Sequence, residues 1–160
     1  MTTQQLSNFY TVQINDMTLQ KALDEHYKIN LQVTPWDQFE ALEARMLIKA
    51  HDISHLIFGC DTSYSGEYCV QTWNKCGSNL NIKLQDGFKY IMNKDLRSLV
   101  LPTSLFSYAF SHISEFVKLR EKIKVQAKLM TKKWEYFQEE PYMDKTISEI
   151  RLEYNIQILE

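Results

Sequence analysis

The chain has 160 residues, of which 44% are hydrophobic and 24% charged, and its formal net charge is −2. This length and composition exclude a disordered chain, a collagen-like fibre and a disulfide-stapled miniprotein. The nearly neutral charge gives no reason to expect a nucleic-acid partner. Only four Gly and three Pro interrupt the sequence, so we expect an all-α fold, a single compact multi-helix domain over 1–160.

Two helices are predicted in the first part of the chain. Asp16 is placed to cap a helix that runs to about Lys28, with Leu19 and Leu23 on its inner face. The run Thr34-Pro35-Trp36-Asp37 combines a cap residue, a proline at the first helical position and an acid in the first turn. It predicts a helix over about 35–58 that stops at Gly59.

Three further helices are predicted downstream. Cap residues at 61–63 begin a helix over about 64–75, and residues 148–156 form a short final helix. Pro102 begins the longest element, which we expect to end before Pro141. Its apolar stripe is Ala109, Ile113, Phe116, Ile123, Ala127, Met130, Trp134 and Phe137. Core packing is the simplest role for this stripe, and a pocket lined by some of Phe106, Phe110, Phe116 and Met130 is the alternative.

The most informative stretch is His51-Asp52-Ile53-Ser54-His55, followed after eleven residues by Glu67. One turn of helix separates the histidines, so their side chains lie roughly 40° apart on one face, with Asp52 at its edge. The next helix carries Gly66 and Glu67 in its first turn, and we expect Gly66 to allow a close approach that brings Glu67 to the histidines. Two imidazoles and up to two carboxylates at one point suit a divalent metal, with zinc favoured and iron or magnesium as alternatives.

Two other interpretations of this stretch remain open on spacing alone. His51 and His55 can be ordinary helix residues, since two histidines four residues apart occur often by chance. The stretch also compares with the His-Glu-x-x-His helix of zinc proteases. Asp52 is one methylene shorter than the glutamate of that motif, which argues against a peptidase.

At these residues the sequence resembles the Coq-four type family of coenzyme Q (ubiquinone) biosynthesis proteins. The hallmark of that family is His-Asp-x-x-His, eleven residues, then Glu. The resemblance extends to Arg45, Gly59, Thr62 and Gly66 around the motif. Near the C-terminus, residues 151–156 (Arg-Leu-Glu-Tyr-Asn-Ile) are similar to the closing segment of the family, with an Asn in place of a Gly.

The resemblance implies a divalent metal held by His51, Asp52, His55 and Glu67. It also implies an apolar site for a polyprenyl tail, and a role in removing the carboxyl group from a polyprenylated benzoate ring, with hydroxylation at the same carbon. The family's alternative role is a non-catalytic scaffold that binds prenyl lipid and organises other quinone-biosynthesis enzymes, with a structural metal. The sequence identifies no general base beyond the ligands, and His26 and His112 are expected to be satisfied or surface histidines and not catalytic groups.

The remaining expectations concern the compartment and the membrane. The first ten residues carry no secretory signal, and no run of eighteen apolar residues occurs, which favours a cytoplasmic protein with reduced Cys60, Cys69 and Cys76. Between Lys118 and Lys133 there are seven basic residues and one acidic residue. Together with the resemblance, this basic stretch predicts peripheral contact with the inner face of a membrane; a solvated surface is the alternative.

Overall fold

The computed structural model describes residues 9–12, 16–80 and 112–159. Its main helices are α2 (Leu19–Ile29), α3 (Leu42–Phe58), α4 (Tyr64–Gly77), α8 (Ile113–Leu129) and α9 (Ile147–Tyr154). Two 3₁₀ helices, η1 (Trp36–Gln38) and η2 (Glu140–Tyr142), lie between them. The described part of the chain contains isolated β-bridges but no strand, so the predicted all-α class is confirmed.

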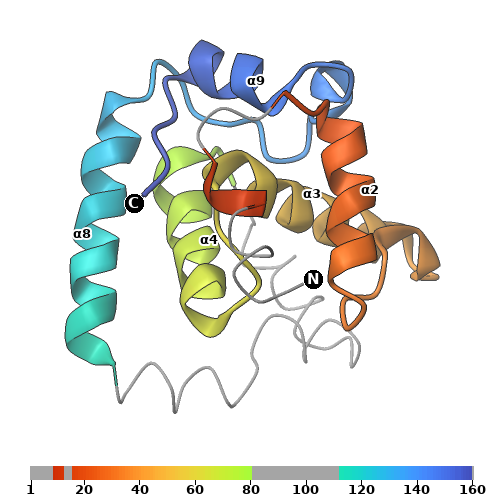
Figure 1. Ribbon diagram of the computed structural model, residues 1–160, viewed down its shortest axis with the longest axis horizontal. Helices are drawn as coiled ribbons and strands as arrows, with labels where there is room; N and C mark the ends of the chain where they lie inside the picture. Colours follow the sequence, from red (N-terminus) through yellow and green to blue (C-terminus); the bar gives the residue numbers. More distant parts are fainter. Residues whose placement is uncertain (1–8, 13–15, 81–111, 160) are drawn as a thin grey trace.

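Helix α3 lies at the centre of the arrangement, and the other helices pack around it (Figure 1). Helix α2 packs on one side of α3 and α4 on the other, α8 packs on α4, and α9 contacts α3. Residues of all these elements share one core, in which Trp73, Trp134, Ile53 and Tyr154 are fully buried. Within the described ranges, no helix is long and apolar enough to span a membrane.

The start of the helix predicted over 35–58 is wrong. Residues Trp36–Gln38 form only the 3₁₀ helix η1, Phe39 is extended, and α3 begins at Leu42. Two contacts with side chains of α3 hold the break: the Arg45 guanidinium binds the carbonyl of Phe39 at 2.5 Å, and Trp36 packs under the ammonium of Lys49. These contacts outweigh a local start signal, because the proline favours a first turn but cannot hold the following residues in a helix.

The end of the long helix predicted to reach Pro141 is also wrong, and the start at Pro102 lies outside the described residues. Helix α8 ends at Leu129. Two backbone hydrogen bonds draw the following chain to other segments: Thr131 N–H donates to Tyr154 at 3.0 Å, and Trp134 N–H donates to Gly77 at 2.8 Å. Trp134 is therefore buried, as its place in the stripe suggests, but from a loop.

Smaller differences concern the helix ends. Thr18, not Asp16, caps α2, since its side chain accepts a hydrogen bond from Lys21 N–H. The predicted helix over 64–75 is α4, extended by two residues to Gly77, and the final helix is α9. Gly59 ends α3 with φ 69° and Asn155 ends α9 with φ 53°. Both left-handed stops are positions that Gly and Asn tolerate best, as the sequence predicts.

Candidate metal centre

One helical turn of α3 presents two imidazoles to a carboxylate on the first turn of α4. His51 Nε2 lies 3.3 Å from Glu67 Oε2, and His55 Nε2 lies 3.2 Å from Glu67 Oε1. One donor atom from each of these three residues lies within 4.8 Å of the other two. The structure thus brings Glu67 to both imidazoles, as the spacing predicts. We call these three residues the metal cluster.

The second nitrogen of each imidazole fixes which nitrogen faces Glu67. His55 Nδ1 lies 3.0 Å from the carbonyl oxygen of Cys60, which can only accept, so Nδ1 carries the hydrogen. His51 Nδ1 lies 3.3 Å from Oδ1 of Asp52, which is again an acceptor when ionised. Hydrogen bonds of this kind hold metal-binding histidines in proteins, because they leave the Nε2 lone pair available to a cation.

Opposing effects set the protonation of the cluster. Burial lowers the pKa of His51, but hydrogen bonds with the carboxylates of Asp52 and Glu67 outweigh it and raise the pKa to about 10. Burial raises the pKa of Glu67, but its hydrogen bonds with His51 and His55 hold it well below the usual range. In the absence of a metal, His51 therefore holds a proton that it shares in a hydrogen bond with the ionised Glu67. A divalent cation would compete with this proton for the same donor atoms.

Asp52 does not lie with the other predicted ligands. Its side chain is 4% exposed, and its Oδ2 accepts a short hydrogen bond of 2.6 Å from the Tyr27 hydroxyl. Its Oδ1 faces the Nδ1 side of His51, away from Nε2. Among the described residues, the group of convergent donors contains His51, His55 and Glu67 without Asp52.

Gly66 has a different role from the one predicted. A Cβ at this position would overlap the backbone carbonyl and Oδ1 of Asp61, not a residue of α3. The Asp61 side chain accepts hydrogen bonds from the backbone N–H and hydroxyl of Ser63, which caps α4. Gly66 thus allows the tight cap loop that sets the first turn of α4, and with it Glu67.

The donor set fits a transition-metal ion better than magnesium. Two imidazole nitrogens and one carboxylate match zinc or iron, whereas Mg²⁺ prefers oxygen ligands. His55 is 1% exposed, but the side chains of His51 and Glu67 remain 29% and 28% exposed. A centre with three protein donors and access from solvent corresponds to sites that keep a position open for a ligand.

His26 on α2 belongs to a buried hydrogen-bond network beside the cluster, so it is a satisfied histidine and not a surface one. Its ring centre lies 6.0 Å from that of His55, and its Nδ1 lies 2.8 Å from the hydroxyl of Tyr10. Asn30 donates to the same hydroxyl at 2.6 Å, and Thr62 donates to Asn30 at 2.9 Å. Burial lowers the pKa of His26 to about 4, so its imidazole is neutral. Sequence reasoning had no signal for this network, since its members come from three segments far apart in the chain.

Arg151, which the family resemblance included, has its structural role at the end of α3. The side chain is 1% exposed, and its guanidinium donates to the carbonyls of Leu56 and Ile57 at 2.8 and 2.9 Å. It also donates to the carbonyls of Tyr10 and Val12 in the N-terminal segment. Arg151 therefore satisfies helix-end carbonyls next to His55 and joins three segments.

Other candidate residues have structural contacts. Tyr68, beside Glu67 on α4, stacks on Phe116 with ring centres 4.3 Å apart, so it has a packing role. Cys60 and Cys69 are buried thiols, and His112 lies at the N-cap of α8.

Comparison with known proteins gives no relative for this chain: no family model, no curated protein and no solved structure matches it.

Proposed function

We propose that this protein binds a divalent metal ion, preferably zinc, through Nε2 of His51, Nε2 of His55 and the carboxylate of Glu67. The observation that carries the proposal is the convergence of three donor atoms from two helices within 4.8 Å, with both imidazoles oriented through their Nδ1 atoms. Iron is the alternative that the same donors accommodate, and magnesium fits less well.

We propose further that the centre acts in ubiquinone or a related prenylquinone pathway, on a polyprenylated benzoate ring. Loss of the carboxyl group as carbon dioxide, with a proton taking its place on the ring, needs no oxidant. Hydroxylation at that carbon would need dioxygen as the oxidant and a redox metal such as iron in the centre. The support is the resemblance at residues 51–67 and the three-donor cluster. When bound, the metal would supply a Lewis acid for the ring carboxylate. The residues of the chain would orient the ligand: partly exposed His51 and Glu67 form the entrance, and buried His55 forms the floor.

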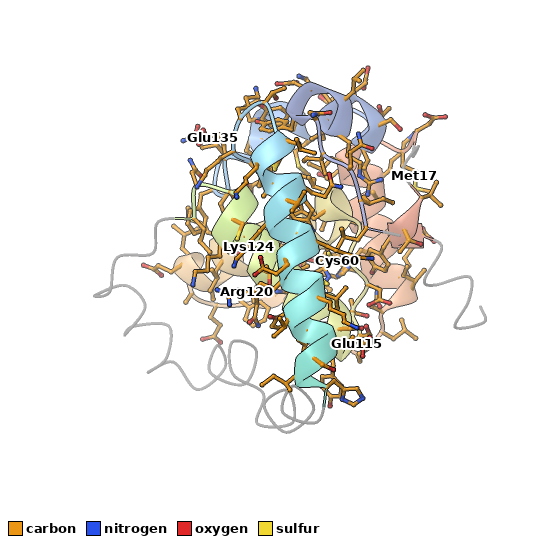
Figure 2. All side chains as sticks on the ribbon, turned by 90° about the vertical axis from the view of Figure 1, so that its left-hand side faces the viewer. Met17, Cys60, Glu115, Arg120, Lys124 and Glu135 are labelled. Atoms are coloured by element: carbon orange, nitrogen blue, oxygen red, sulfur yellow. The ribbon has the colours of Figure 1, made fainter. Side chains whose placement is uncertain are left out.

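A groove supports the lipid part of this proposal. It lies between α8 and the C-terminal segment and has a volume of about 920 Å³. Its apolar lining residues are Val117, Val125, Ile158 and Leu159, and its polar ones are Lys118, Glu121, Lys122, Gln126 and Gln157. Figure 2 views the molecule from the side that α8 covers. Phe116, expected to line a pocket, is instead buried against Tyr68, and Phe106 and Phe110 lie outside the described residues.

The groove is connected to the cluster through the end of α3. A Cβ on Gly59 would lie 2.5 Å from Cγ2 of Ile158, so the groove residue Ile158 rests against Gly59. The next residue, Cys60, accepts the hydrogen bond of His55. A prenyl tail in the groove would therefore lie against the loop that orients a metal ligand.

Metal binding is tested by elemental analysis and thermal unfolding of metal-stripped and zinc-loaded protein. We expect zinc to stabilise the fold, by about 2.7 kcal/mol at a free concentration one hundred times the dissociation constant. His55→Ala should remove most of this effect, Glu67→Gln should weaken it, and His112→Ala should leave it unchanged. Equal melting temperatures with and without zinc, together with parental metal content in His55→Ala, would refute the centre.

The pathway is tested with a prenylated 4-hydroxybenzoate and protein loaded with zinc or iron, with mass spectrometry of the products. Loss of carbon dioxide that depends on His55 supports an enzyme, whereas binding without conversion supports the alternative of a prenyl-lipid scaffold for other quinone-biosynthesis enzymes.

Peripheral membrane contact is tested by co-sedimentation with anionic liposomes at low and high salt. Lys124 and Lys132 are already paired with Glu121 and Glu153, which reduces the charge available to lipid.

A further inference from the structure

The position of Asp52 separates this centre from the four-ligand set that the family resemblance implies. Asp52 follows His51 directly on α3, close enough in sequence to be a ligand. Yet both of its oxygens have partners elsewhere: Oδ2 accepts from the Tyr27 hydroxyl at 2.6 Å, and Oδ1 lies 3.3 Å from His51 Nδ1. The carboxylate is thereby held on the Nδ1 side of the ring, while the metal cluster lies on the Nε2 side.

The hydrogen bond from Tyr27 is strong enough to hold the Asp52 carboxylate in its position. A hydroxyl that donates to an ionised carboxylate at this short distance forms a charge-assisted hydrogen bond, about twice as strong as a neutral one. Asp52 is 4% exposed, so little water is present to replace the phenol if the carboxylate turns away. Moving Asp52 towards the cluster would also leave the Tyr27 hydroxyl without its acceptor.

Tyr27 is itself held in place by packing. It lies on α2, which packs against α3, and its ring meets that of His26 edge to face with centres 5.1 Å apart. His26 is fixed in turn by the hydroxyl of Tyr10. The Tyr27 hydroxyl is therefore supplied by α2, a helix that carries none of the three residues of the metal cluster.

We propose that Tyr27 is a positioning residue that keeps Asp52 out of the metal's coordination sphere, so that the bound ion has three protein donors and an open position for an oxygen or nitrogen anion. This inference rests on the proposed metal site. In it Asp52 orients His51 and supplies negative charge to the centre without occupying a coordination position.

The experiment uses Co²⁺ as a spectroscopic substitute for zinc and azide as the probe of the open position. In the parent protein, azide should change the visible absorption of bound Co²⁺, because a position is available. In Tyr27→Phe, which keeps the ring and removes the hydroxyl, the freed Asp52 should bind the ion. The azide response should then be lost, and it should return in the double variant Tyr27→Phe/Asp52→Ala.

Two further variants complete the test. Asp52→Ala alone should bind Co²⁺ more weakly, because His51 loses the carboxylate that orients it. Once saturated with Co²⁺ it should still respond to azide, because no ligand has been removed. This variant tests the inference even if Tyr27→Phe fails to fold. Tyr154→Phe is the matched control: it removes a hydroxyl that donates to Tyr142 at 2.7 Å, between α9 and η2, and should leave the response unchanged.

Each other outcome has a distinct meaning. A parent protein that binds Co²⁺ without responding to azide, and responds once Asp52 is replaced by Ala, would show that Asp52 is already a ligand and would overturn the inference. A full azide response in Tyr27→Phe, with Co²⁺ bound about 10- to 100-fold more weakly, would also overturn it, because Tyr27 and Asp52 would then only orient His51. Failure of the parent protein to bind any Co²⁺ or Zn²⁺ would refute the proposed function itself, and this inference with it.

Discussion

Two neighbouring sites in the C-terminal half of α3, the Arg151 site and the metal cluster, treat buried charge in opposite ways. At the C-terminal end, the Arg151 guanidinium is surrounded by backbone carbonyls of Tyr10, Val12, Leu56 and Ile57, which accept its hydrogen bonds. One turn earlier, the metal cluster places two imidazole nitrogens and a carboxylate against one another. The first arrangement leaves no capacity for a ligand, whereas the second retains lone pairs that a cation can use. Burial of charge alone therefore does not identify a functional site; the remaining donor capacity does.

The largest effect on stability is expected at the Arg151 site. Arg151→Met removes a buried cation that organises several carbonyls from three segments, so we expect a loss of about 4 kcal/mol in the free energy of unfolding. Arg151→Lys keeps the charge but has fewer directed donors, and should recover only part of the loss. Urea denaturation measures both. A loss below about 1 kcal/mol for Arg151→Met would show that water replaces the guanidinium, and that the Arg151 site is not a purely structural counterpart of the metal cluster.

The next effect concerns His26, which lies beside the metal cluster but, like Arg151, is buried and held by hydrogen bonds within the chain. Its folded pKa of about 4 lies below the unfolded value of about 6.5, so only the unfolded state binds a proton between these pH values. The folded state should therefore lose about 3 kcal/mol of stability, relative to a variant without this histidine, as pH falls from 6.5 to 4.

The measurement compares denaturation of the metal-free parent protein with His26→Gln across this pH range, and with His112→Gln as the control. The parent and His112→Gln should show the same pH dependence, and His26→Gln a shallower one. Identical slopes in all three proteins would contradict the burial of a neutral imidazole at position 26.

The contribution of the metal cluster to stability should change with pH in the opposite direction. The folded pKa of His51, about 10, lies above the unfolded value, so its contribution to stability is complete below pH 6.5 and is lost as pH rises towards 10. A metal must displace that proton, so zinc binding at pH 8 should release about one proton from His51. A pH indicator in weak buffer would measure the release, and His51→Ala should release correspondingly less. Release that is equal in the two proteins would place the proton elsewhere.

The smallest effect tests how Arg151 is positioned. Helix α9, which carries it, begins with a capping box in which Thr146 and Glu149 bind each other's backbone N–H groups. Thr146→Ala should cost about 1 kcal/mol of stability by thermal denaturation. Glu149→Gln should cost less, because the amide oxygen still accepts from the backbone of Thr146. If Thr146→Ala left stability unchanged, α9 would be held by its core contacts alone.

The sequence by itself determined those features that depend on a few consecutive residues. One-turn spacing places His51 and His55 on the same face, and the left-handed stops at Gly59 and Asn155 follow from the conformations that these residues tolerate. The all-α class follows from the scarcity of Gly and Pro. The return of Glu67 towards the histidines was also readable, because only a short loop separates α3 from α4.

Only the tertiary structure decided where the helices begin and end, and which groups surround the cluster. Helix α8 stops at Leu129, where the distant carbonyl of Tyr154 accepts from Thr131 N–H. Before α3, Arg45 of its own first turn binds the Phe39 carbonyl, and Trp36 packs under Lys49. Asp52 meets the Nδ1 side of His51, and α2 brings the Tyr27 hydroxyl to its other oxygen. Periodicity reports which side of a helix a residue occupies. The partner that this side meets depends on the packing of segments far apart in the chain, which local residue patterns do not encode.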